Sequence, residues 1–158
     1  MYINRLLEHA YNNFDITLIS VNKYVFDSFT LAALSKADYN IAALHAGVDS
    51  LKEYEKYMIY LRDKYRVPVD KTKLVAYEYN KSVDLPMGIL KRMFSEESFI
   101  GCVSYQSLRV KYRNINSFYA KWAYKLIKDE YLQIFSKFNI VHETSIGDKV
   151  KKLLKLGI

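Results

Sequence analysis

Four short apolar runs divide the chain, and each is followed by a stretch with helical periodicity. The runs are Ile16–Val21, Tyr39–Leu44, Leu74–Tyr79 and Phe99–Val103. Strands that alternate with helices favour a parallel sheet with crossover helices. We therefore expect a three-layer α/β fold with a mostly parallel sheet, in which ligands bind at the carboxyl edge. No glycine-rich loop follows any of the runs, so the usual phosphate-binding loop of such folds is missing.

The apolar spacing also places the helices. Asp49-Ser50 is the expected N-cap of a long helix, with Glu53 in capping-box position relative to Ser50. Tyr39–Leu44 is apolar enough to be a strand that is buried on both faces. The helices are expected, in chain order, at Ile3–Ala10, Phe26–Leu34, Leu51–Tyr65 and Pro86–Phe94, and from Ser117 onward with Trp122, Leu126 and Tyr131 or Ile134 facing inward.

Length and composition are those of a globular protein. The chain has 158 residues, of which 51% are hydrophobic and 26% charged, enough to bury a core. We expect a single α/β domain over residues 1–144 and a basic amphipathic helix over residues 145–158. No apolar run approaches the length that crosses a bilayer. The one cysteine, Cys102, excludes an intramolecular disulfide, and a cytoplasmic protein is the simplest interpretation.

Positive charge is concentrated in the last third of the chain. Residues 107–158 hold 11 Lys/Arg against 4 Asp/Glu, whereas the 106 residues before them hold 13 of each. The net charge of +7 therefore comes entirely from this part. A one-sided basic surface attracts partners that carry phosphate. The alternative is a solvated basic face that only keeps the protein in solution.

Five segments resemble, in their order and spacing, the motifs of one family. Together they make the chain, from about Leu6 to Phe138, resemble the carboxyl-terminal half of the MinD/ParA family of deviant P-loop ATPases. The resemblance implies an incomplete P-loop-NTPase-like fold. The segments are Phe14-Asp15-Ile16-Thr17-Leu18-Ile19-Ser20 (an aromatic-Asp-apolar strand), Leu31–Asp38 (a helix ending in Ala-Asp), Asp49-Ser50-Leu51 (the start of the next helix), Val75–Asn80 (a strand ending in an asparagine motif) and Gly101–Gln106 (a strand similar to Gly-Val-Ile-Pro-Tyr-Asp).

Departures from this family suggest that the chain lacks its catalysis. Ser20 stands where the family has a catalytic-site Asp, and Ser104 and Gln106 replace a Pro and an Asp. The five glycines, at 47, 88, 101, 147 and 157, are not clustered into a phosphate loop. Positioning and charge stabilisation are nearly all of phosphoryl-transfer catalysis. We therefore expect no ATP hydrolysis by this chain alone, no cofactor beyond weak ATP binding, and no metal site.

A remnant of the adenine site is the first candidate function. Asn80 matches the position whose amide reads the adenine edge in the family, and an amide offers both a donor and an acceptor. Tyr105 and Arg109 follow the fourth run and are expected to border the same pocket. The alternative for Asn80 is a loop asparagine that satisfies its own backbone.

The terminal helix is the second candidate. Val150, Leu153, Leu154 and Ile158 share one helical arc, and only Leu156 violates the split. The pattern resembles the tail by which MinD docks on membranes, where apolar side chains enter the headgroup boundary. The alternative is a terminal helix that packs back on the domain. The residues expected to contact a membrane or a phosphate backbone are Lys149, Lys151, Lys152, Leu153, Leu154 and Lys155.

These features predict a degenerate ATPase-type domain that acts as a non-catalytic localisation or assembly protein. The branch it most resembles is that of Tad-type pilus localisation proteins. Its expected partners are another protein or a second copy, with an anionic membrane surface as a further one, which would place it at the inner face of the membrane. The sequence leaves open whether the chain is a fragment, and what covers the sheet edge next to the family's missing half.

Two alternative functions remain. One is a nucleic-acid-binding, partition-type module that tracks a phosphate backbone with the basic last third. The other is an ATPase fragment that is active only with a partner bearing the P-loop. Zinc spacings and catalytic triads are absent from the sequence, and His9, His45 and His142 are far apart. The residues expected to contact nucleic acid are Arg109, Lys111, Arg113, Lys121, Lys125 and Lys128.

Overall fold

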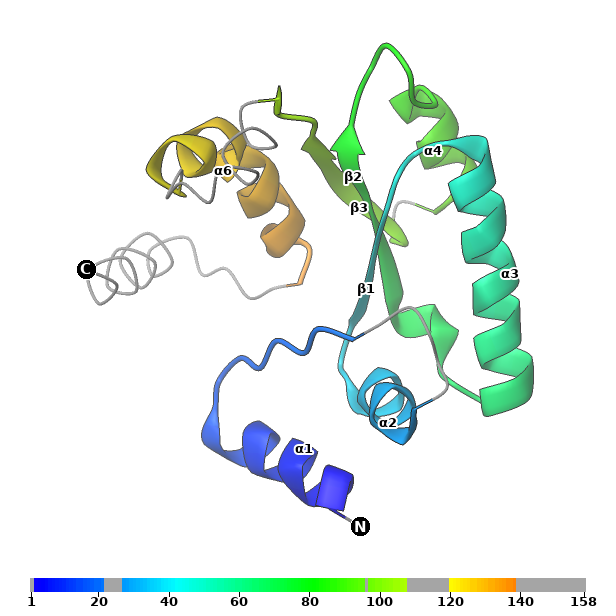
Figure 1. Cartoon of the computed structure of the whole chain (residues 1–158), viewed down its shortest axis with the longest axis vertical. Helices are drawn as coiled ribbons and strands as arrows, with labels where there is room; N and C mark the ends of the chain where they lie inside the picture. The colour runs from blue at the N-terminus through cyan, green and yellow to red at the C-terminus, as the bar shows by residue number, and fades with distance from the viewer. Residues whose placement is uncertain (1, 22–26, 96, 108–119, 139–158) are drawn as a thin grey trace. The chain divides into compact units, whose positions relative to one another are not determined.

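The computed structural model of the chain describes residues 2–21, 27–95, 97–107 and 120–138. Helices and strands alternate after an initial pair of helices (Figure 1). The elements are α1 (Tyr2–Asn13), α2 (Ser28–Lys36), β1 (Asn40–Leu44), α3 (Val48–Tyr65), the 3₁₀ helix η1 (Val69–Lys71), β2 (Thr72–Tyr79), α4 (Met87–Met93), β3 (Phe99–Ser104) and α6 (Ala120–Ser136).

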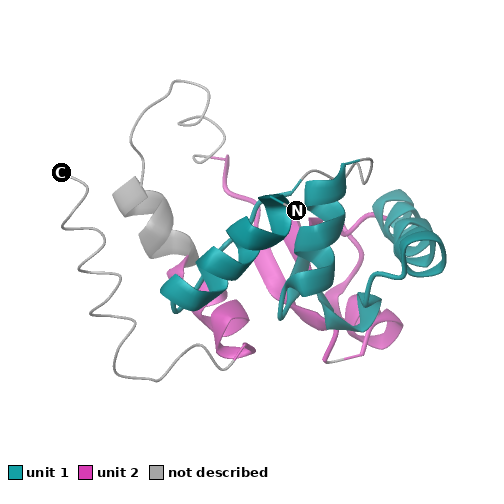
Figure 2. Cartoon of the chain, turned by 90° about the horizontal axis from the view of Figure 1, so that it is seen from below, with its two compact units in different colours: residues 1–42, 48–73 teal, residues 43–47, 74–158 magenta. Residues whose placement is uncertain are grey.

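The chain divides into two compact units that interleave in sequence (Figure 2). Unit 1 comprises residues 1–42 and 48–73, and unit 2 comprises residues 43–47 and 74–158. The expected boundary at residue 144 lies outside the described residues, so the single domain over residues 1–144 stays a prediction.

A three-stranded parallel sheet in the order β1-β2-β3 confirms the α/β class and three of the four expected strands. In the ladder between β2 and β3, Leu74 lies opposite Phe99 and Val103 opposite Tyr77. The register shifts once near each end of this ladder. β1 does not have the expected burial on both faces, because its positions alternate between covered and exposed.

The prediction of a strand at Ile16–Val21 is wrong. These residues form neither helix nor strand in the structure, and Figure 1 shows them as a drawn-out trace after α1. A strand needs a hydrogen-bonded neighbour as well as a suitable sequence, and no described strand pairs with this segment. Ile16 and Leu18 are consequently exposed.

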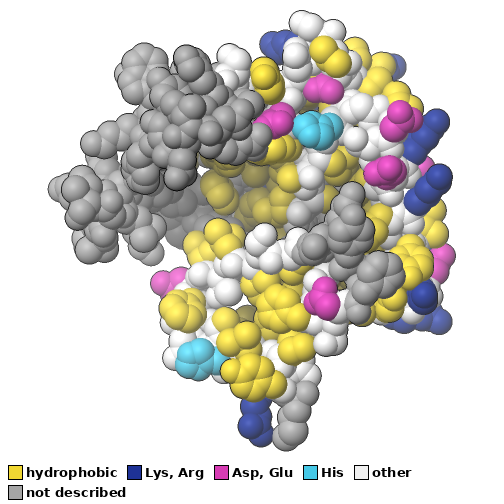
Figure 3. All heavy atoms as spheres, in the orientation of Figure 1, with side chains coloured by type: hydrophobic (Ala, Val, Ile, Leu, Met, Phe, Trp, Pro, Cys, Tyr) yellow, Lys and Arg dark blue, Asp and Glu magenta, His cyan; other side chains and the backbone are white. Residues whose placement is uncertain are grey.

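Residues 2–21, the amino-terminal arm, carry much of the exposed apolar surface. No residue of α1 is buried, although Ile3, Leu7 and Ala10 are partly covered, and α1 contacts α2. Figure 3 shows hydrophobic side chains gathered over this part of the surface. The large exposed apolar residues of the arm are Tyr2, Leu6, Tyr11, Phe14, Ile16, Leu18 and Ile19.

In unit 2, α6 packs on β3 and places its apolar face over the sheet. Figure 1 shows α6 on one side of β2 and β3, with α4 on the other. Ile134 is buried and Tyr131 packs against the same cluster, as the helical spacing predicted; the expected start at Ser117 lies outside the described residues, as do the side chains of Trp122 and Leu126. The core cluster consists of Val75, Ile100, Val103, Ile134 and Phe138.

In unit 1, α3 packs through Leu61 onto Val67 and the apolar side chains of α2. α3 begins at Val48, so its N-cap position is Gly47. The expected N-cap at Asp49-Ser50 is wrong by two to three residues, and both residues lie inside the first turn of the helix. Asp27 is the N-cap of α2. The Asn40 amide donates to the carbonyl of Leu34 at 2.9 Å, which ties the end of α2 to the start of β1.

We predict opposite effects for two glycine-to-alanine substitutions. A Cβ at Gly101, which has φ +154°, would lie 3.0 Å from Cγ1 of buried Ile134. Gly101→Ala should lower the free energy of unfolding by about 1–3 kcal/mol through overpacking and backbone strain. A Cβ at Gly88, in α4, would meet nothing within 4 Å. Gly88→Ala should stabilise by about 0.5–1 kcal/mol through helix propensity. Urea unfolding tests both signs, and equal effects would contradict the close packing of α6 on Gly101.

The N-cap of α2 predicts a pH dependence of stability. A carboxylate oxygen of Asp27 accepts from the amide N of Thr30 at 2.7 Å, and its other oxygen accepts from the Thr30 hydroxyl at 2.7 Å. Both bonds lower the pKa of Asp27 below its usual range, and the bond from the Thr30 backbone has the larger effect. The cap therefore stabilises the fold above the unfolded-state pKa and loses this contribution as the pH falls through the lowered pKa.

Asp27→Ala should lower the urea midpoint at neutral pH, and the difference from wild type should shrink in strong acid. Urea unfolding of both proteins at several pH values measures this difference. Asp15→Ala, at an exposed position outside any helix, is the control. If the difference in urea midpoint between the two proteins stays constant from neutral pH to strong acid, the Asp27 carboxylate is not the cap.

Candidate functional site at the carboxyl edge

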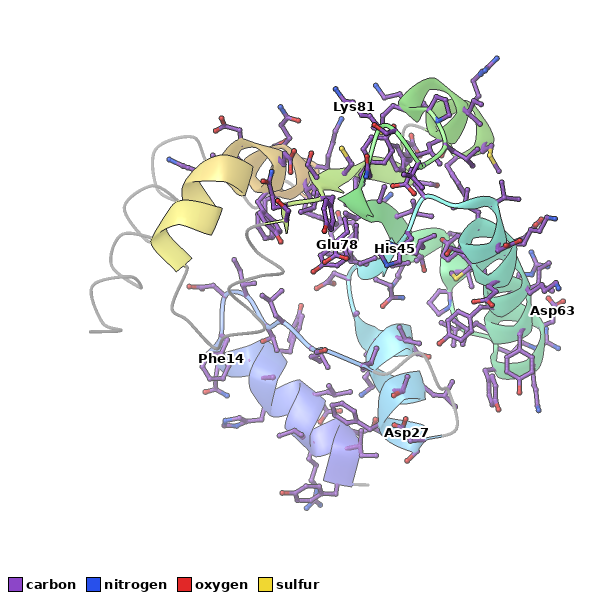
Figure 4. All side chains as sticks on the ribbon, turned by 45° about the horizontal axis from the view of Figure 1, so that its top comes forward. Phe14, Asp27, His45, Asp63, Glu78 and Lys81 are labelled. Carbon is purple, nitrogen blue, oxygen red and sulfur yellow. The ribbon has the colours of Figure 1, made fainter. Side chains whose placement is uncertain are left out.

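The carboxyl ends of the three strands lie at one edge of the sheet, as they must in a parallel arrangement. The residues at this edge all belong to unit 2. Figure 4 shows His45 after β1, Glu78 near the end of β2, and Lys81 in the loop that follows. The rings of His45 and Tyr77 have centroids 6.5 Å apart, so side chains from two strands meet here.

The end of β2 carries a strained residue. Glu78 has φ +54°, a left-handed conformation that costs energy for a residue with a side chain. The register shift between Tyr77 and Tyr79 makes Glu78 the extra residue of a bulge. The ladder resumes beyond it, because the amide N of Tyr105 donates to the carbonyl of Tyr79 at 2.9 Å. This bond joins Tyr105 to the residue just before Asn80, so these two residues of the predicted site lie close to each other in space.

Asn80 opens a loop that is closed on itself. Its side-chain Oδ1 accepts from the amide N of Ser82 at 3.0 Å, and its own amide N donates to the Asp84 carboxylate at 2.7 Å. The carbonyl of Asn80 in turn accepts from the amides of Val83 and Asp84. These bonds are those of the alternative interpretation, in which the asparagine satisfies its own loop. The adenine-binding role of Asn80 and of half-exposed Tyr105 stays a prediction.

The end of β3 is held by a carboxylate from α6. Glu130 accepts from the amide N of Ser104 at 2.8 Å with one oxygen and from the Ser104 hydroxyl at 2.5 Å with the other. Both donors of one residue are thus satisfied by one side chain, which makes Glu130 a clamp on the strand end. Hydrogen bonds to a charged acceptor are among the stronger ones in proteins.

Cys102 lies in β3, two residues before this clamp, and is partly buried. Burial raises the pKa of its thiol, and the negative charge of Glu130 raises the pKa further, against a smaller opposite effect of Lys81. A raised thiol pKa lowers the fraction of thiolate at neutral pH, which is unlike a catalytic cysteine.

The remaining chemistry of the described residues is limited. They contain no group of three or more His, Cys, Asp or Glu side chains placed to hold a metal ion. None of their helices is both long and apolar enough to cross a membrane. Arg109, Lys111 and Arg113 lie outside the described residues, as does the terminal helix with Lys149, Lys151, Lys152, Leu153, Leu154 and Lys155. Their contacts with nucleotide, membrane or nucleic acid stay predictions.

Glu130 is the residue that sequence reasoning missed. It precedes Ile134 by one helical turn and therefore shares the inward face of α6. A carboxylate on an apolar helix face requires a partner, because an unpaired buried charge is costly. That position on the helix was the signal that could have identified it.

The Ser104–Glu130 contact predicts a measurable coupling. Ser104→Ala removes only the hydrogen bond of the Ser104 hydroxyl. Glu130→Ala removes both hydrogen bonds and leaves the amide N of Ser104 without its acceptor. We expect losses in the free energy of unfolding of about 1 kcal/mol and about 1–3 kcal/mol respectively. The double variant should lose less than the sum, by a coupling of about 0.5–3 kcal/mol. Asp129→Ala, at the exposed neighbour, is the matched control, and strictly additive losses would show that the clamp does not form.

Comparison of the chain with protein-family models, with curated proteins and with solved structures finds no match, so the assignment of function depends on the geometry of this edge and of the amino-terminal arm.

Proposed function

We propose that this chain is a non-catalytic localisation or assembly protein with a degenerate ATPase-type α/β fold, and that it acts by binding other protein chains. The observation that carries this proposal is the Glu130 carboxylate on the amide N and hydroxyl of Ser104. It lies at the carboxyl edge of the sheet, where nucleotides bind in open parallel α/β folds.

A bound phosphate would need donors at this edge. Phosphate groups are held by main-chain N–H groups and hydroxyls at strand ends and helix starts. At the end of β3 these donors already serve Glu130, and after β2 the amide N of Asn80 already serves Asp84. The carboxylates of Asp84 and Glu130 would repel a phosphate, whereas Lys81, in the same loop as Asp84, would attract it. This arrangement supports a fold retained for its surfaces rather than for nucleotide chemistry.

The amino-terminal arm supplies a surface for a protein partner. Its large exposed apolar residues are spread along α1 and the extended segment after it, and Figure 3 shows hydrophobic side chains over this part of the surface. Single exposed apolar side chains need no explanation, but many of them in one short part of the chain make it the candidate for an interaction site. An aromatic residue such as Phe14, labelled in Figure 4, is the kind of side chain that anchors interfaces.

A nucleotide titration tests the proposal. The chain is mixed with a fluorescent ATP analogue, with and without Mg²⁺, up to millimolar nucleotide. We expect no saturable binding, because the donors after β2 and β3 are engaged within the chain. Asn80→Ala should behave as wild type, and Asn12→Ala, in exposed α1, is the control for an unrelated asparagine. Saturable binding that Asn80→Ala abolishes and Asn12→Ala retains would overturn the proposal and restore the adenine site.

A further inference from the structure

The segment Ile16–Val21 has the properties of a strand but lacks a neighbour. It is drawn out between α1 and α2, and its backbone makes no hydrogen bond with another described residue (Figure 1). Leu18 is 80% exposed and Ile16 55% exposed. Three of its six residues are Ile or Val, which favour strands, and none is charged.

β1 has an outer edge with no described strand beside it. It lies at the end of the strand order, and among the described strands it pairs with β2 alone. Ile41 is 50% exposed, and Tyr39 and Ala43, which share its face, are exposed as well. β1 contains no charged residue, and neither proline nor a described bulge protects its outer edge. An open, uncharged edge strand is a template for pairing with a further strand.

We propose that Ile16–Val21 of one chain adds to the outer edge of β1 in a second copy of the chain. This partner choice rests on the proposed function, and it names the protein that the arm binds. Each copy carries both the unpaired segment and the open edge, so two copies complete each other in a reciprocal, two-fold interface. Main-chain hydrogen bonds provide the affinity in strand addition of this kind.

The arm is arranged to present this segment to another molecule. α1 contacts α2 within the same chain, and Glu8 of α1 forms an ion pair with Lys36 of α2 at 3.6 Å. The segment lies between α1 and α2 in the chain, and these two helices already pack on each other. The segment is therefore presented as a loop that connects two packed helices. The absence of charge on the segment and on β1 removes any repulsion between the two strands.

A matched pair of variants tests the interface without disturbing a core. Leu18 is 80% exposed, and Val83, in the loop after β2, is 81% exposed. The wild-type chain should be a dimer by light scattering in a concentration series. Leu18→Lys should weaken the dimer by at least about tenfold, and Val83→Lys should leave it unchanged. A wild-type chain that is monomeric at all concentrations overturns the proposal, as does equal weakening by both variants.

Cysteine cross-linking identifies the two strands. Chains that carry Cys102→Ser and Leu18→Cys are mixed with chains that carry Cys102→Ser and either Ile41→Cys or Ala43→Cys, which covers two registers. A disulfide between the two kinds of chain is expected on oxidation, and none with Val83→Cys in place of Leu18→Cys. The absence of a disulfide in both registers overturns the proposal.

A chain that carries both Leu18→Cys and Ile41→Cys separates exchange from closure within one molecule. A disulfide-linked dimer supports the proposal. An internal disulfide in a monomer overturns it, because the segment then joins its own sheet. If these experiments show no strand exchange, the proposed assembly function still holds with another partner. If the chain binds ATP in a way that depends on Asn80, the proposed function is wrong, but the dimer is not affected.

Discussion

The parallel pairing of β2 with β3 is the constraint on which unit 2 depends. The amide N of Leu74 donates to the carbonyl of Ser98 at the start of the ladder, and that of Tyr105 donates to Tyr79 at its end. Both strands are largely buried, and the core cluster draws on each of them. The loop of Asn80, the bulge at Glu78 and the clamp at Ser104 are all attached to the ends of these two strands. Their positions are set by the ladder.

The carboxyl edge of a parallel sheet does not by itself define a chemistry. A parallel sheet brings loop residues together at the carboxyl ends of its strands, whatever chemistry they carry. In this chain the residues brought together include two carboxylates, each bonded to a main-chain N–H group, and a thiol whose pKa is raised, beside His45, Glu78 and Lys81. The exposed apolar residues of the arm, by contrast, are on elements that pack little on their own chain.

Apolar runs and their spacing predicted three strands, most helices and the inward face of α6, because burial of apolar side chains determines these features. The same reasoning was wrong for Ile16–Val21. Composition measures how well a segment fits a strand, but pairing depends on which edge is within reach. Glu130 was missed because its partner is 26 residues away in sequence. The asparagine loop was anticipated as one of two interpretations, since a side chain that bonds its own turn is a local feature.

The missing side chain at Gly101 has a consequence for the position of α6 along its axis. Ile134 occupies the space that a Cβ at residue 101 would need, and Glu130 reaches Ser104 from one turn earlier on the helix. Four helical residues span about 6 Å along the axis. The position of α6 along its axis is therefore fixed at two points about one turn apart, by a steric contact at Ile134 and by hydrogen bonds at Glu130. A shift of α6 by a single residue would take both contacts out of register together, so the two contacts select one alignment of helix and sheet from the several that apolar packing alone would accept.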